Sequence, residues 1–88
     1  MRDLADLERE SQENLVRFLH VDLDVARTFL EVAQGTSSEH RAQLVEKVHS
    51  VIKTTRQFEG RVQDPRVRSV IQEKLDRLEK RVADLTGS

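Results

Sequence analysis

Apolar residues in the first part of the chain follow the periodicity of one long and broadly apolar helix. Between Leu15 and Ala33, twelve of nineteen residues are apolar, and on a helical wheel they cover an arc of roughly 220°. An ordinary surface helix needs an apolar stripe of only about 100°, so we expect this segment to be covered from more than one side. One charged residue, Asp22, falls close to the centre of the apolar arc.

The helical phase is continuous from Asp3, a suitable N-cap, to Gly35, which we expect to end the helix in a left-handed conformation. Two apolar stripes run along this segment and predict a first helix over about residues 3–34. One stripe has strict three-four spacing and contains Val16, Leu19, Leu23, Ala26, Leu30 and Ala33. The other is broader and contains Leu4, Leu7, Ser11, Leu15, Phe18, Asp22, Val25, Phe29 and Val32.

Two further segments have the periodicity and the end signals of helices. Thr36 and Glu39 have the spacing of a capping box, which predicts a second helix over about residues 37–59, ended by Gly60. Asp64-Pro65 predicts the start of a third helix over about residues 65–86. The apolar stripe of the second helix contains Leu44, Val45, Val48, Val51, Ile52, Thr55 and Phe58. The stripe of the third contains Val67, Val70, Ile71, Leu75, Leu78, Val82 and Leu85, with Lys74 inside it.

The connections between these helices are short, so neighbouring helices are expected to be antiparallel. No segment alternates with a period of two, and no strand is therefore predicted. We expect residues 1–88 to form a single all-α domain, an up-down-up antiparallel three-helix bundle with an extended first helix. A helical hairpin with a mobile third helix is the alternative, which the clean stripe and good caps of the third helix disfavour.

The first helix is longer than its two companions can cover. Counting back from the connection at residues 35–38 places the end of the second helix level with residue 12, so residues 2–11 have no partner within the chain. This segment either frays or bends over the end of the bundle, or it meets a second copy of the protein. A homodimer would also use the excess apolar arc, which gives these interface candidates: Leu4, Leu7, Phe18, Val21, Val25, Phe29 and Val32.

Composition and charge exclude several classes of function. The formal net charge of −1 argues against a general electrostatic interaction with nucleic acid or anionic lipid. The basic residues of the third helix alternate with acidic ones, which is typical of a solvated face rather than a nucleic-acid surface. Six charged or histidine residues between positions 15 and 33 argue against a membrane span. Without cysteines or an apolar signal segment, we expect a soluble, cytoplasmic protein.

Three polar residues are expected at one level of the bundle. Counting through both connections places Asp22 level with His49, and His49 beside Lys74. A buried carboxylate needs a partner, so these residues could form a buried polar cluster. Alternatively, Asp22 faces a dimer partner or water, or it belongs to a catalytic or ligand site. The three histidines lack metal-ligating spacing, so we expect neither a metal nor a cofactor. His20, on the polar strip of the first helix, and His40, in the first turn of the second, are expected to be solvated.

The segment His49-Ser50-Val51-Ile52-Lys53-Thr54-Thr55 is distantly similar to phosphotransfer domains, in which an exposed histidine precedes a lysine and small residues. Here the lysine comes four residues after the histidine rather than three, and Thr54 stands in place of glycine. No nucleophile elbow or phosphate-binding glycine loop occurs. The sequence therefore favours a non-catalytic helical interaction module that binds a second copy or an unidentified protein. A phosphotransfer-like or other catalytic bundle that uses His49 or Asp22 is the alternative.

Overall fold

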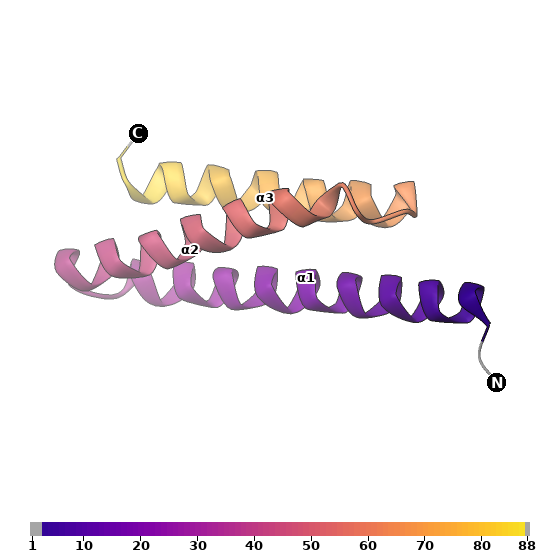
Figure 1. Cartoon of the computed structure of the whole chain (residues 1–88). Helices are drawn as coiled ribbons and strands as arrows, with labels where there is room; N and C mark the ends of the chain where they lie inside the picture. The colour runs from indigo at the N-terminus through magenta and orange to yellow at the C-terminus, as the bar shows by residue number, and fades with distance from the viewer. Residues whose placement is uncertain (1–2, 88) are drawn as a thin grey trace.

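The computed structural model describes residues 3–87, and three α-helices make up most of this part of the chain. They are α1 (Leu4–Gln34), α2 (Ser38–Glu59) and α3 (Pro65–Leu85). Successive helices run antiparallel (Figure 1), and each helix packs against both of the others. The fold is the predicted all-α, up-down-up bundle with an extended first helix, and every helix end lies within one residue of its expected position.

Two of the three helix starts are capped by the expected aspartates. Asp3 Oδ1 accepts a hydrogen bond from the backbone N–H of Asp6 over 2.9 Å. Asp64 Oδ1 accepts one from the N–H of Arg66, also over 2.9 Å, and Pro65 occupies the first turn of α3. Each aspartate thereby satisfies a backbone donor that has no partner within its helix, and it places negative charge at the positive end of the helix dipole.

The connection between α1 and α2 differs in detail from the prediction. Ser37, not Thr36, has the extended backbone of the N-cap and caps α2 with its hydroxyl. Gly35 has a φ of −105°, so the expected left-handed conformation is wrong. The side chain of Arg41 explains the difference, because its Nε donates to the carbonyl of Ala33 over 2.9 Å and its Nη2 to that of Thr36 over 3.2 Å. These bonds satisfy carbonyls at the end of α1 without a left-handed turn.

The core is built from one face of each helix. In α1 it takes the stripe of strict three-four spacing, of which all but the half-buried Val16 are buried. The core residues of the other two helices are Leu44, Val45, Val48, Ile52, Ile71, Leu75, Leu78 and Val82. Val70, which the pattern assigned to the stripe of α3, is instead exposed, and Val62 in the α2–α3 connection is fully buried. Because α2 and α3 occupy the strict stripe, the broader stripe of α1 is left largely uncovered.

Candidate functional site

One face of α1 is apolar and exposed along nearly its whole length. Six large side chains on this face keep between 41% and 72% of their surface exposed. They are called the outer face of α1 below and are Leu4, Leu7, Phe18, Val21, Val25 and Val32. All six belong to the seven interface candidates drawn from the sequence. The seventh, Phe29, is half-buried against the core.

Side chains of α2 and its C-terminal connection support one edge of the outer face. Phe18 packs edge-to-face on Phe58, with ring centres 6.5 Å apart and planes at 85°. Arg61 lies over the Phe58 ring, 5.0 Å from its centre, and Lys47 Nζ lies 5.6 Å from the centre of the Phe29 ring. Such cation–π contacts stabilise by about 0.5–1 kcal/mol at exposed sites. The edge is therefore held in place while the rest of the face stays open.

The outer face follows a seven-residue repeat. Three exposed polar residues also lie on this face, between the apolar ones. With these residues included, successive positions are alternately three and four residues apart along the whole of α1. The nine positions are Leu4, Leu7, Ser11, Asn14, Phe18, Val21, Val25, Thr28 and Val32. This alternation is the pattern of a coiled-coil seam, in which side chains of one helix insert between those of a second. An open groove of about 290 Å³ lies along the seam beside Val21, Val25 and Phe29.

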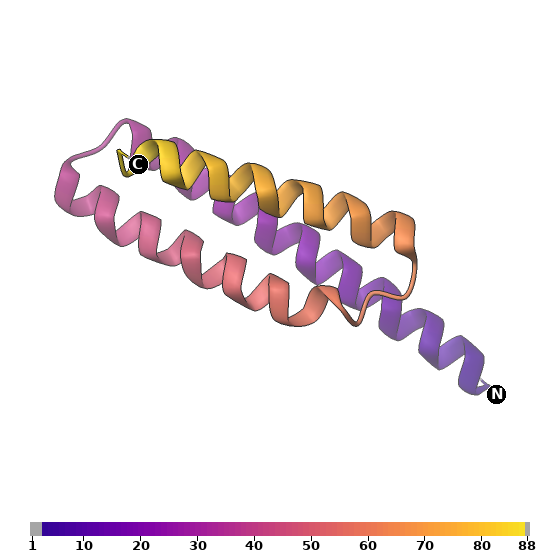
Figure 2. The ribbon, with the colours of Figure 1, turned by 90° about the horizontal axis from the view of Figure 1, so that it is seen from above.

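The first turns of α1 project beyond the rest of the bundle (Figure 2). Gln12 marks the level at which the bundle begins, because its side-chain amide hydrogen-bonds the backbone of Arg61 and of Gln63 in the α2–α3 connection. This is the level that residue counting predicts. Leu4 and Leu7 lie beyond it, on the segment that we call the overhang (residues 4–11), and Leu4 is the most exposed apolar side chain of the outer face. A groove of about 590 Å³ lies between the overhang and the start of α3.

Asp22, His49 and Lys74 do not form the expected buried cluster. Asp22 is half-buried and His49 is exposed, whereas Lys74 Nζ lies 3.0 Å from Nδ1 of His20. The prediction of a solvated His20 is also wrong, because this side chain is half-buried between α1 and α3. Burial lowers the pKa of His20, the positive charge of Lys74 lowers this pKa further, and Asp24 partly opposes both effects. Residue counting gave the level of Lys74 along the bundle but not the direction in which it points.

Lys74 also lines an open groove of about 300 Å³ between α1 and α3, together with Arg27, Arg77, Arg81 and Asp24. Two of its arginines pair with nearby carboxylates. Arg27 Nη2 lies 4.0 Å from Asp24, and Arg77 Nη2 lies 2.8 Å from an acidic residue one turn earlier in α3. These pairs neutralise part of the positive charge, so the groove is mixed in charge rather than strongly basic.

The residues considered for catalysis are not assembled into a site. Neither His49 nor Asp22 lines any of the three grooves described above. Between residues 3 and 87, no three side chains of the His, Cys, Asp or Glu type gather where a metal ion could be held. No helix in the same range combines the length and apolar character needed to cross a membrane.

The fold and the outer face define a small three-helix bundle whose longest helix presents an uncovered apolar seam. No protein-family model matches the chain, and comparisons with curated proteins and with solved structures likewise give no match. The assignment of a function therefore depends on the geometry and chemistry of this seam.

Proposed function

We propose that the protein is a non-catalytic helical self-association module, and that the outer face of α1 docks a second copy of the chain. The observation that carries the proposal is the exposure of six large apolar side chains on one helix face. An exposed apolar stripe of this length is unusual on a stable monomer and marks interaction sites. Symmetric dimers are the commonest oligomers of soluble proteins.

The spacing of the seam supports a helix as the docking element. A three-four alternation sustained over nine positions of α1 places all of them on one narrow strip, which matches the contact strip of a second helix. Full burial of an apolar side chain is worth about 1.5–3 kcal/mol. Since these side chains are already partly covered, docking would recover on the order of 1 kcal/mol from each one that the interface covers in either copy, enough to offset the entropic cost of association.

The catalytic alternative has less support. An enzyme or phosphotransfer bundle would be expected to place a polar cavity around Asp22 or His49, and the described grooves avoid both residues. The groove beside Val21, Val25 and Phe29 is instead lined mainly by apolar side chains and lies on the exposed side of α1.

Size-exclusion chromatography with light scattering, at about 1–100 µM protein, tests the proposal. The wild-type chain is expected to reach twice its mass of 10.2 kDa. Phe18→Glu with Val21→Glu is expected to give a monomer with unchanged helical circular dichroism, because both charges would be buried in the seam. Gln43→Glu with Ser50→Glu, at exposed positions of α2, is the charge-matched control and should remain a dimer. A wild-type monomer at the highest concentration would overturn the proposal.

A further inference from the structure

Two consecutive positions of the seam of α1 are polar, and the place of this polar step indicates how a second copy lies. Ser11 and Asn14 are exposed and interrupt the apolar residues at the level where α1 enters the bundle. Leu4 and Leu7 precede this polar step, and Phe18 is the first apolar residue of the seam after it. Polar groups that become buried in an interface need hydrogen-bond partners, so the favoured arrangement sets this polar step against another polar step.

We propose that two copies associate antiparallel along the outer faces of α1, with the two-fold axis between Ser11 and Asn14. The inference rests on the proposed self-association and adds the direction and register of the second helix. The seam is formed by positions a and d of the heptad, and in an antiparallel coiled coil an a residue of one helix faces a d residue of the other. Here Leu4, Ser11 and Phe18 are a residues, and Leu7, Asn14 and Val21 are d residues. The facing pairs, each formed twice, are then Leu4 with Val21, Leu7 with Phe18, and Ser11 with Asn14. Val25 and Val32 lie beyond this paired segment.

This register matches the chemistry of every facing pair. Apolar side chains meet apolar ones. The hydroxyl of Ser11 and the amide of Asn14 can each donate and accept a hydrogen bond across the interface. Moving the register by two steps of the seam would set Asn14 against the apolar Phe18 instead, leaving a buried amide without a partner.

The charges beside the seam favour the same register. Glu10 and Arg17 each precede a seam residue by one position, and the register sets Glu10 of one copy against Arg17 of the other, twice. Arg17 is exposed and makes no ion pair within residues 3–87. Asp3 and Asp24 would meet at the outer ends, where both are exposed and where solvent screens their repulsion. Exposed pairs add little affinity, but they discriminate between registers.

The overhang gives a third reason for the antiparallel arrangement. In the proposed register, each overhang lies along the partner's α1 from Asn14 to Val21, which is the exposed flank at the start of the partner's bundle. The two bundles then lie end to end and do not compete for space beside the seam. A parallel pair would set overhang against overhang, so that both still project beyond the bundles they belong to.

Disulfide trapping tests the register directly, because the chain contains no cysteine. Leu4→Cys and Val21→Cys variants, one carrying a mass tag, are oxidised separately and as a mixture, and the products are resolved without reductant. The proposal expects about tenfold more mixed disulfide than self-linked disulfide, because Cα atoms farther apart than about 7 Å cannot be bridged. Self-linked Leu4→Cys would show a parallel dimer, and efficient linking of Leu7→Cys to Val25→Cys would show the neighbouring antiparallel register. Either result would overturn the proposal.

Charge exchange provides a second readout that needs no cysteine. Arg17→Glu is expected to raise the dimer Kd by about fivefold, because it sets two like-charged pairs across the axis. Adding Glu10→Arg to the same chain should restore the wild-type Kd only if these two positions face each other. Light scattering of the reduced cysteine variants distinguishes a failure of self-association from a failure of the register. Monomers would refute self-association itself, whereas dimers that fail to cross-link in the expected pairs would refute only the register.

Discussion

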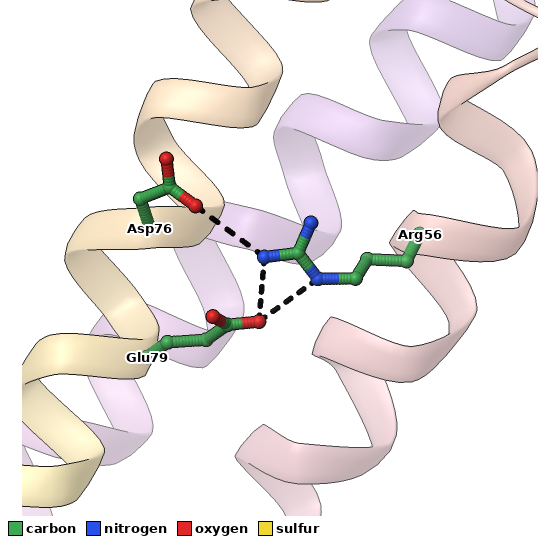
Figure 3. Close-up of polar contacts among 3 residues, drawn as sticks. All are labelled: Arg56, Asp76 and Glu79. Atoms are coloured by element: carbon green, nitrogen blue, oxygen red, sulfur yellow. Dashed lines mark hydrogen bonds and ion pairs between the residues drawn. The ribbon is translucent and has the colours of Figure 1, made fainter.

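Arg56 of α2 and Glu79 of α3 form the closest ion pair between helices in the described part of the chain (Figure 3). The Nε and Nη2 atoms of Arg56 both donate to Oε1 of Glu79, over 2.8 and 2.6 Å. The same Nη2 lies 3.4 Å from Oδ1 of Asp76. One guanidinium therefore links α2 to two carboxylates that lie three residues apart on the same side of α3.

A double-mutant cycle should rank these two contacts. We expect a coupling free energy of about 0.5–1 kcal/mol between Arg56→Ala and Glu79→Ala, because the pair is partly shielded and makes two hydrogen bonds. The coupling of Arg56→Ala with Asp76→Ala should be smaller, since Asp76 is more exposed and more distant. Urea unfolding at low and high salt measures both. Equal couplings would contradict the ranking of the two contacts. Couplings that salt does not reduce would contradict their description as ion pairs.

Gln12→Ala should loosen the end of the bundle at which the overhang begins. The wild-type amide donates to Arg61 O over 2.8 Å and accepts from Gln63 N over 2.9 Å. We expect the free energy of unfolding to fall by about 1 kcal/mol, measured by urea denaturation. Gln63→Ala is the matched control and should change little, because it keeps the backbone N–H that Gln12 accepts from. A larger loss in the control than in Gln12→Ala would place the stabilising contact elsewhere.

Most of the fold could be predicted because helical periodicity and capping residues are local signals. The stripe from Leu19 to Ala33 identified the core face, and counting residues through a short connection gave the level of Gln12. Other features depend on side chains that reach across the fold. No local pattern shows that Arg41 ends α1, that Val62 in a connection is buried, or that the Gln12 amide holds that connection.

In the candidate site, too, the local pattern was predicted and the contact between distant side chains was not. The apolar seam was visible in the sequence because an arc of roughly 220° exceeds what two neighbouring helices cover. The polar cluster was wrong because level along a bundle does not determine rotation about a helix axis. Lys74 lies at the expected level but reaches His20 on the other side of the α1 core stripe from Asp22. Whether a side chain such as His20 is half-buried depends on how closely α3 packs.

His20 should make the protein less stable as the pH falls. Burial and then Lys74 lower its folded pKa below 6.5, so the unfolded chain takes up the proton first. The contribution of His20 to stability is therefore retained above pH 6.5 and lost as the pH falls through the folded pKa. His20→Gln, which keeps an acceptor for Lys74, should reduce the loss of unfolding free energy between about pH 7.5 and about pH 5.

An NMR titration of the His20 imidazole gives the direct measurement. The wild-type pKa should lie below 6.5. Lys74→Met should move this pKa upward but leave it below the ordinary value, because burial is the larger cause. A wild-type pKa at or above 6.5, or no change in Lys74→Met, would contradict the described contact.

Thr55→Val should stabilise the bundle. Thr55 lies on the core face of α2 with 0% of its surface exposed, and its hydroxyl has no hydrogen-bond partner among residues 3–87. Valine has nearly the same shape without the polar atom, so we expect the free energy of unfolding to rise by about 1 kcal/mol. Thr55→Ser is the matched control, because it keeps the hydroxyl and removes the methyl group, and it should lower stability. The urea midpoints of the wild type and the two variants measure these differences in stability. A less stable valine variant would mean that the hydroxyl has a partner in solution, such as a buried water or a carbonyl of the preceding turn.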